Sequence, residues 1–223
     1  MKAFLEPTTY IESDHPEIIR FAQSAVVDAV TPVDKAVRLY YAVRDRIRYN
    51  PYCTSITMDH YRANYVLAQK QGFCIQKAIV LAAAARAADI PCRLGFAIVR
   101  NHLATHRLIE MMKTDLFVFH GYNAFFLNDK WVKATPAFDL ALCERFGTLP
   151  LEFDGTADSI FHPYDRAGKR HMEYVYDYGQ FEDFPFDLML SEFRKYYPHF
   201  FELLQGQGAD VAQELSGDFR NEE

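Results

Sequence analysis

The sequence predicts an α+β fold, in which a helical N-terminal half packs on an antiparallel sheet. Two observations support this prediction. Residues 16–47 and 74–90 place apolar side chains at helical spacing. Residues 92–99 and 116–135 have the length and composition of strands, and a tight hairpin turn at Asn128-Asp129-Lys130 divides the second run into two strands.

The composition is that of a globular protein. The chain has 223 residues, of which 50% are hydrophobic and 15% aromatic, enough for a substantial core. We expect a single domain over residues 1–204, with its core at about 33–139 and an aromatic-rich elaboration at 140–204. Residues 205–223 are polar and acidic, and we expect them to form a flexible tail.

The charge and hydropathy exclude several classes of partner. The net charge is −6 and the pI is about 5.8, and no basic face is evident, so we expect no nucleic-acid partner. No apolar run reaches the roughly 18 residues that a membrane span needs, so we expect no membrane partner. The N-terminus lacks the apolar core of an export signal. We therefore expect a cytoplasmic protein with four reduced cysteines.

The first two helices begin where a capping residue precedes a proline. Ser13 or Asp14 precedes Pro16, and Thr31 directly precedes Pro32. A capping side chain accepts a hydrogen bond from the first turn, and proline fits the first helical position because its missing N–H is not needed there. Both sites therefore predict helix starts.

Other segments give less regular signals. The charged string at 44–46 predicts a solvated helix face, and residues 101–113 predict a short helix or a lid-like insertion. Residues 137–185 are rich in aromatic residues, Asp, Pro and Gly, and we expect long ordered loops packed over the core. Residues 187–204 predict a C-terminal helix that is interrupted near Pro198.

The helix predicted to begin at Cys74 carries the main chemical signal. Gly72 permits an unusual backbone approach just before it, and Pro91 ends it. A thiol in the first turn of a helix lies near unpaired N–H groups and the positive end of the helix dipole. This environment favours the thiolate, which is the nucleophilic form of cysteine. A lone cysteine is more often a small buried apolar residue, so this pattern needs a partner.

His120 provides that partner on the first strand of the predicted hairpin. A cysteine at a helix start and a histidine on a facing strand are the arrangement that thiol acyl transfer requires. The imidazole takes the thiol proton, and backbone N–H groups at the helix start can hold the oxyanion.

Several spaced motifs resemble those of the transglutaminase-like superfamily. The segment Gly72-Phe73-Cys74 with Ala78, Leu81 and Ala88-Asp89-Ile90-Pro91-Cys92-Arg93 is similar to the pattern G-x-C…A…L…A-x-G-I-P-x-R. His120-Gly121-Tyr122, Trp131 and Thr135-Pro136 resemble H-x-W-x-E…W…D-P-T, and residues 43–49 resemble the helix that precedes the nucleophile in bacterial members. The resemblance spans residues 33–139.

This resemblance implies a papain-like α+β fold with a Cys-His-Asp triad. Cys74 corresponds to the nucleophile and His120 to the base. The family's Asp aligns with Thr135, which cannot stabilise an imidazolium as a carboxylate does. Asp139, four residues further on, is therefore our predicted third member, with Thr135 as its rival. Ala124 stands where the family usually has Glu. For a second oxyanion donor, Gln69, Gln71 and Tyr49 are candidates that the sequence does not rank.

The resemblance implies a cysteine-dependent acyl-transfer enzyme that acts on peptide or glutamine-type amides through a thioester on Cys74. Bacterial members of the superfamily are commonly described as cysteine proteases, which favours hydrolysis over cross-linking and a peptide or protein substrate. No metal or organic cofactor is expected. Two alternatives stay open: an inactive relative that binds proteins or peptides, favoured by Ala124 and Thr135, and a thiol acyltransferase that uses a carried acyl group.

Overall fold

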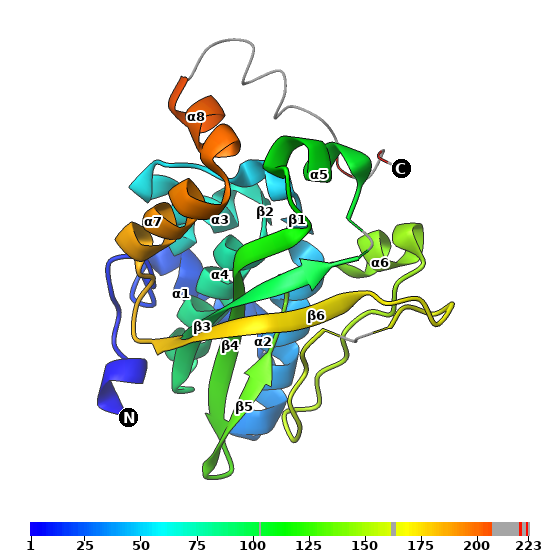
Figure 1. Cartoon of the computed structure of the whole chain (residues 1–223). Helices are drawn as coiled ribbons and strands as arrows, with labels where there is room; N and C mark the ends of the chain where they lie inside the picture. The colour runs from blue at the N-terminus through cyan, green and yellow to red at the C-terminus, as the bar shows by residue number, and fades with distance from the viewer. Residues whose placement is uncertain (103, 162–163, 207–218, 220–221, 223) are drawn as a thin grey trace.

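Two layers make up the fold, a four-stranded antiparallel sheet and a group of helices packed on one of its faces (Figure 1). This computed structural model describes residues 1–102, 104–161, 164–206, 219 and 222. The predicted α+β fold with an antiparallel sheet is confirmed. The strand order is β5-β4-β3-β6, and the strands are β3 (Cys92–Asn101), β4 (Leu116–Leu127), β5 (Lys130–Ala134) and β6 (Met172–Phe181).

The N-terminal half is helical, as predicted. Thr31 caps its helix through a reciprocal pair of hydrogen bonds with Asp34, whereas the cap of the first helix is His15 and not Ser13 or Asp14. The elements of this half are the short 3-10 turns Lys2–Phe4 (η1), Pro51–Cys53 (η2) and Met58–Tyr61 (η3), the helices α1 (Pro16–Ala25), α2 (Pro32–Arg46), α3 (Ala63–Gln69) and α4 (Cys74–Ala87), and the paired parallel strands β1 (Arg48–Tyr49) and β2 (Gln71–Gly72).

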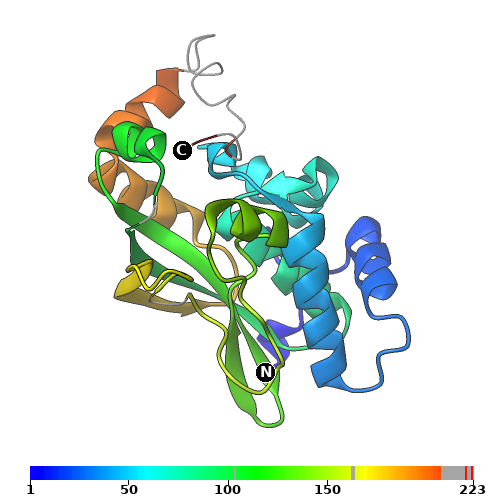
Figure 2. The same ribbon diagram turned by 90° about the vertical axis from the view of Figure 1, so that its right-hand side faces the viewer.

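Helix α4 is the central element of the helical layer. Every residue from Ile75 to Arg86 is buried, because α1, α2 and α3 surround the helix on one side and β3 and β4 cover the other. Figure 2, turned by 90°, shows these helices on one side of the sheet. Alanines at 82–85 let the neighbouring elements approach closely, so the helix that begins at Cys74 forms much of the core.

Strand β4 has the predicted bounds but contains an irregularity. Phe119 has a φ of 64°, and the register with β3 shifts between Ala97 and Val99. A residue in this conformation marks a β-bulge, which changes the direction of the side chains on its two sides. Beyond the bulge successive side chains point to opposite faces of the sheet: Asn123 faces α4, and Tyr122 covers Gly95 on the other face.

The expectation of long loops over 137–185 is wrong in two places. This part contains the helix α6 (Leu140–Phe146) and the edge strand β6, which pairs along its length with β3. Strand β6 leaves its outer side in solvent, and Tyr174, Val175 and Tyr176 are each at least 37% exposed. Its sequence therefore lacks the alternation of apolar and polar residues by which a half-buried strand is recognised.

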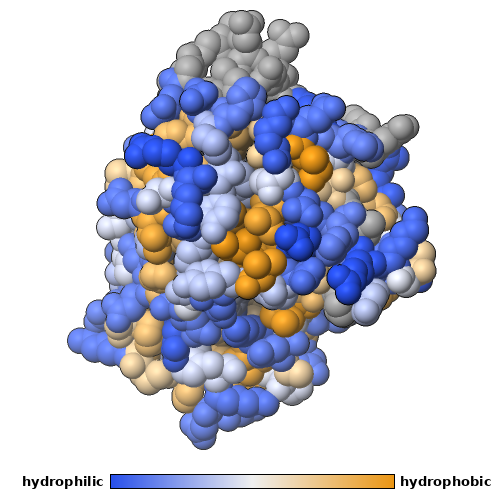
Figure 3. All heavy atoms as spheres, in the orientation of Figure 1, coloured by the Kyte–Doolittle hydropathy of each residue, from blue (hydrophilic) through white to orange (hydrophobic). Residues whose placement is uncertain are grey.

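Three helices cover the upper end of the sheet. They are α5 (His106–Met112), α7 (Phe186–Tyr196) and α8 (Pro198–Gly206), and the predicted break near Pro198 is confirmed. Figure 3 shows hydrophobic residues gathered near the centre of the face that the sheet presents. The flexible tail expected over 205–223 lies mostly outside the described residues. Among the helices that are described, none is both long and apolar enough to cross a bilayer.

Candidate active site

The first turn of α4 is held in place by a buried glutamine. The Oε1 atom of Gln76 accepts the N–H of Phe73 at 3.2 Å, and its Nε2 donates to the carbonyl of His60 at 2.9 Å. The side chain is 2% exposed. Gln76 therefore ties the residue before Cys74 to η3, which fixes where the helix begins. The sequence analysis did not identify this residue, although a Gln three positions after a helix start is a capping signal.

Backbone contact sets the distance between the two elements that carry Cys74 and His120. A Cβ atom placed on Gly121 would lie 2.9 Å from the Cα of Ile75 and 3.1 Å from the carbonyl oxygen of Cys74. Real Cβ atoms do not approach other atoms this closely, so only glycine fits at 121. The strand lies directly against the helix start, one residue from each candidate catalytic side chain.

Cys74 and His120 line the same small cavity, which has a volume of about 50 Å³. The remaining lining residues are predominantly apolar and come from three places: η2 with its neighbours, β4, and the covering helices. They are Tyr49, Pro51, Tyr52, Thr54, Phe73, Leu108, Met111, Met112, Phe117, Val118, Phe193, Tyr197 and Phe200. The structure thus brings two of the three predicted catalytic residues together, beneath a cover formed by α5, α7 and α8.

Burial decides the charge state of the Cys74 thiol. It raises the pKa of this thiol to about 11, against an ordinary value of 9.0. The backbone N–H groups of Gly121, Ile75 and Cys74 act in the opposite direction, because each can donate to the thiolate. At neutral pH the closed site therefore holds a neutral thiol that is surrounded by donors able to stabilise negative charge.

His120 is also neutral in the closed site. Burial lowers the pKa of this imidazole from 6.5 to about 3. Its ring packs against Phe161, with the ring centroids 4.7 Å apart, and lies 6.5 Å from the ring of Tyr174. The Nε2 atom is buried and has no hydrogen-bond partner within the part of the chain that the structure describes.

Asp139 is buried, but its described bonds lead to the backbone. One carboxylate oxygen accepts the N–H of Leu142 at 3.0 Å and so caps α6, and the other accepts the N–H of Tyr49 at 2.8 Å. The structure does not join this carboxylate to the Nε2 atom of His120. Its assignment to the triad stays a prediction.

Thr135 lies in the place that the family pattern assigns to the triad acid. Strand β5 pairs Ala134 with Asn123, so the next residue lies beside the part of β4 that leads back to His120. The Oγ1 atom of Thr135 is buried and, like Nε2 of His120, makes no hydrogen bond within 3.5 Å among the described residues, although the side chain of Tyr174 lies beside it. Five other buried polar atoms in the described part of the chain share this property, so it does not by itself mark Thr135 as a member of the site.

The three candidates for the oxyanion site differ in their location. Gln69 is exposed on α3, and Gln71 accepts a hydrogen bond from Arg48 at 2.7 Å, away from the cavity. Tyr49 lines the cavity with Cys74. Its hydroxyl pKa is raised well above 10.0, mainly by burial and then by the neighbouring Cys74.

Lys77 is a buried cation that the sequence analysis missed. It lies one turn after Cys74, is fully buried, and donates to the carbonyls of Arg44 at 2.8 Å and Ile47 at 2.7 Å. Burial lowers the pKa of this amine from 10.5 to about 7, while the negative charge of Asp139 acts in the opposite direction. Lys77 thus connects the C-terminal end of α2 with the nucleophile helix.

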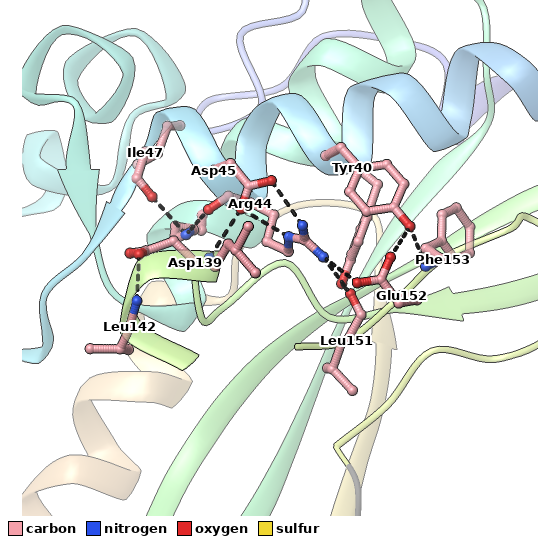
Figure 4. A network of polar contacts seen from close by, with 12 residues as sticks. Tyr40, Arg44, Asp45, Ile47, Asp139, Leu142, Leu151, Glu152 and Phe153 are labelled. Carbon is pink, nitrogen blue, oxygen red and sulfur yellow. Dashed lines mark hydrogen bonds and ion pairs between the residues drawn. The ribbon is translucent and has the colours of Figure 1, made fainter. Parts of the chain in front are cut away.

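The expectation of a solvated face over residues 44–46 is wrong for Arg44, which is 4% exposed. Its guanidinium donates to Asp45, to the carbonyl of Leu151 and to Glu152, as Figure 4 shows. Asp45 in turn accepts the N–H of Leu140 at 3.1 Å. This network joins the end of α2 to the start of α6, next to Asp139.

The described residues contain no cluster of three or more His, Cys, Asp or Glu that could hold a metal ion.

Comparison with known proteins places this arrangement in a family. No curated protein sequence matches the chain. Two solved structures are similar to it: a putative cysteine protease from Cytophaga hutchinsonii (17% identity, TM-score 0.45, covering 60% of this chain and 40% of that one) and a putative protease from Parabacteroides distasonis (17%, 0.39, covering 60% and 24%). This chain therefore matches less than half the length of either. The sequence model of the transglutaminase-like superfamily matches residues 19–136, more than half of the chain. The chain belongs to the transglutaminase-like superfamily.

Proposed function

We propose that the protein is a cysteine-dependent acyl-transfer enzyme that hydrolyses peptide or glutamine-type amides through a thioester on Cys74. One observation carries the proposal. Cys74 and His120 line a single buried cavity at the start of α4, where three backbone N–H groups can donate to the sulfur. Nucleophile, base and oxyanion donors are the parts that acyl transfer needs.

In the proposed reaction, His120 accepts the thiol proton and the Cys74 sulfur forms a bond to the carbonyl carbon of the substrate. The tetrahedral oxyanion accepts hydrogen bonds from the N–H groups at the start of α4. The C–N bond breaks, and the leaving nitrogen takes the proton from His120. Water then attacks the thioester carbonyl and gives one proton to His120. The C–S bond breaks, and the leaving Cys74 thiolate takes this proton back from His120, which releases the acid and restores the thiol and the neutral imidazole.

The proposed reaction requires the cover to open. In the closed site, burial keeps both groups neutral, because it raises the pKa of the Cys74 thiol to about 11 and lowers the pKa of the His120 imidazole to about 3. When substrate enters past α5 and α8, water reaches both groups. Hydration lowers the pKa of the Cys74 thiol and raises the pKa of the His120 imidazole. In the closed state the cavity of about 50 Å³ has room for only a few water molecules. The choice of water over an amine as the second acceptor rests on the analogy with bacterial superfamily members that are described as cysteine proteases.

Asp139 receives a positioning role in this proposal. By accepting the N–H groups of Tyr49 and Leu142, it holds one wall of the cavity relative to α6. Thr135 is the rival for direct contact with the His120 ring, since both have a buried polar atom without a partner in the described structure.

Intact-protein mass spectrometry after exposure to an activated ester tests the proposal. We expect one acyl group on the wild-type chain, located on Cys74 by peptide mapping, and no acylation of Cys74→Ala. Cys92→Ala is the matched control, because Cys92 is buried in β3 away from the cavity, and we expect it to behave as wild type. Acylation of the Cys74→Ala chain at the wild-type rate would refute the proposal. Turnover of peptide amides is then measured for the wild-type chain and for the His120→Gln variant.

A second function, that of a protein- or peptide-binding relative without catalysis, is favoured by the unpartnered Nε2 atom of His120. Without an acceptor at this nitrogen, an imidazolium lacks there the stabilisation that a triad carboxylate gives. If the wild-type chain is not acylated but retains binding to peptides, this second function is the correct one.

A further inference from the structure

Two residues near the C-terminal end of the chain lie against the cavity of Cys74. The N–H of Glu222 donates to the carbonyl of Phe219 at 3.3 Å. Both side chains lie against Tyr52. Figure 2 shows the short red segment that contains them between α5 and η2.

The carboxylate of Glu222 is bound by three donors from two separate elements. The hydroxyl of Tyr52 donates at 2.5 Å, the hydroxyl of Thr105 at 2.8 Å and the guanidinium of Arg107 at 3.0 Å. Tyr52 and Thr105 are 6% and 4% exposed, and the guanidinium of Arg107 lies 4.6 Å from the centre of the Tyr52 ring. We call Tyr52, Thr105 and Arg107 the carboxylate subsite.

Phe219 occupies an aromatic pocket beside this subsite. Its ring centroid lies 5.4 Å from that of Phe146, 5.8 Å from that of Tyr49 and 6.3 Å from that of Tyr52. The side chain is 8% exposed. Burial of one aromatic ring in such a pocket is a typical anchor for peptide recognition.

The subsite is continuous with the candidate active site. Tyr49 and Tyr52 line the cavity that holds Cys74, and Thr105 accepts the N–H of Leu108, which lines the cavity from α5. A residue bound to the carboxylate subsite therefore holds η2 and the start of α5 together at the edge of the cover.

We propose that the carboxylate subsite and the aromatic pocket form the substrate-recognition site of this enzyme, and that Phe219 and Glu222 fill it in cis. The class of substrate is a peptide or protein segment with an aromatic residue three positions before an acidic one. This proposal rests on the proposed function, since it assigns a substrate class to the Cys74 site. The chain's own segment then acts as a competitive inhibitor, which an acidic segment of this pattern displaces.

The chemistry of the donors supports this class of ligand. Two hydroxyl groups and a guanidinium all donate hydrogen bonds, so together they bind an anionic group that has oxygen acceptors. The bond from arginine is charge-assisted. A neutral amide in place of the carboxylate loses the pairing with Arg107 and brings an N–H₂ group that donors cannot satisfy. The subsite therefore discriminates Glu from Gln at this position.

Fluorescence anisotropy with a labelled, C-terminally amidated peptide of residues 219–223 tests the proposal on the full-length chain. We expect Phe219→Ala/Glu222→Gln to bind this peptide at least about tenfold more tightly than wild type, because a segment tethered in cis competes at a high effective concentration. Glu202→Gln, an exposed carboxamide substitution on α8, is the matched control and is expected to bind as weakly as wild type.

Two further variants locate the binding. Adding Tyr52→Phe to the double variant removes only the hydroxyl that contacts the carboxylate, and we expect about fivefold weaker binding of the peptide, an effect consistent with the loss of one hydrogen bond to a charged group. A peptide with Gln in place of the residue equivalent to Glu222 should bind the double variant at least about tenfold more weakly than the original. Equal binding of the two peptides, or equal binding of the original peptide to wild type and double variant, would overturn the proposal.

Two measurements separate this proposal from its alternatives. The double variant could have a lower melting temperature because it loses the buried ring of Phe219. Glu222→Gln alone keeps this ring, and we expect it to bind the peptide more tightly than wild type. A segment with a purely structural role predicts lower melting temperatures and no gain in binding for either variant. Repeating the titration with Cys74→Ala added removes the proposed nucleophile but not the subsite. If the wild-type chain is not acylated but the double variant binds the peptide, the proposed recognition site stands and the proposed enzymatic function fails. If the chain is acylated but the peptide does not bind, the enzymatic function stands and the recognition site fails.

Discussion

The floor and the cover of the Cys74 cavity are built in different ways. The floor consists of α4 and β4, whose backbones touch at Gly121 and whose buried polar groups, such as Gln76, make hydrogen bonds within the core. The cover consists of α5, α7, α8 and the residues Phe219 and Glu222, which meet through ring contacts and through the half-exposed Arg107.

This difference separates two tasks. Contacts in the floor are dense and cannot change without loss of the fold, so they hold the relative positions of Cys74 and His120. The contact between Arg107 and Glu222 at the edge of the cover is partly solvated, so this edge can break at small cost. Stability therefore depends mainly on the floor, and access to the thiol depends mainly on the cover. The following predictions test this division, from the largest expected effect to the smallest.

The largest effect is expected from Gly121→Val, which breaks the floor. The added side chain meets the backbone of Ile75 and Cys74, which cannot move independently of α4. We expect a loss of about 2–4 kcal/mol in the free energy of unfolding, measured by urea denaturation, together with loss of acylation. Gly147→Ala is the control, because its Cβ meets no atom within 4 Å and costs only the strain of a φ of 65°, about 1 kcal/mol. Equal losses for both variants would show that the contact at Gly121 is unimportant.

A second effect, on the pH dependence of stability, is expected at Lys77. The unfolded chain keeps this proton up to a pKa of 10.5, whereas the folded protein loses it near 7. The unfolded state therefore binds more protons between these values, and stability rises with pH. Above about pH 8 the thiols begin to act in the opposite direction, because burial raises the pKa of all four cysteines in the folded protein.

The window from pH 7 to 8 is thus the one to measure. We expect wild type to gain about 1 kcal/mol across it and Lys77→Met to gain almost nothing. Lys195→Met, at an exposed position on α7, should retain the wild-type slope. A slope that persists in Lys77→Met would assign the pH dependence to another group.

A third test compares Asp139 with Thr135. Asp139→Asn keeps one acceptor oxygen but loses the charge that serves two N–H groups, so we expect a loss of about 1–2 kcal/mol in stability. As a positioning residue it should lower the acylation rate by less than about tenfold without shifting the pH profile of the rate, whereas removal of a triad carboxylate costs orders of magnitude.

Thr135→Val is the companion variant, since it removes only a hydroxyl that has no described partner. If Thr135 contacts the His120 ring during the reaction, this variant changes the pH profile with little effect on stability. A fall of more than about a hundredfold in Asp139→Asn, with a shifted profile, would instead make Asp139 the third member of the triad.

The smallest effect on stability is expected for Glu222→Gln, which loosens the cover. An ion pair with a partly exposed arginine contributes little, so we expect a loss of at most about 1 kcal/mol. The rate at which a thiol reagent labels Cys74 should nevertheless rise at least about fivefold at the same pH, because labelling follows the population of the open site. The melting curve and the labelling rate are measured on the same samples. A large loss of stability with unchanged labelling would contradict the division between floor and cover.

The floor of the site could largely be predicted from the sequence. The start of α4 at Cys74, the bounds of β4 and the hairpin at 128–130 are local patterns of spacing and turn chemistry, and the structure confirms them. Local patterns suffice there because most neighbours in these elements are close in the sequence or share one buried face.

What could not be predicted depends on partners distant in the sequence. Strand β6 forms because it pairs with β3, about eighty residues earlier, and its exposed outer side hides the usual alternation. Arg44 and Lys77 look like surface charges until the loop at Leu151 and the end of α2 are placed around them. The bulge at Phe119 gives no signal in the sequence, because an aromatic residue rarely adopts a positive φ.

The close backbone contact at Gly121 also limits how far Cys74 and His120 can move relative to each other. Gly121 follows His120 and touches Ile75, which follows Cys74, so the two reactive side chains are separated from a rigid backbone contact by one residue each. Backbone atoms in van der Waals contact shift by only tenths of an ångström, whereas a misplacement of about 1 Å costs about a hundredfold in rate. In the proposed reaction, substrates of different sizes would displace α5 and α8 while the thiol and the imidazole keep the positions that this contact gives them.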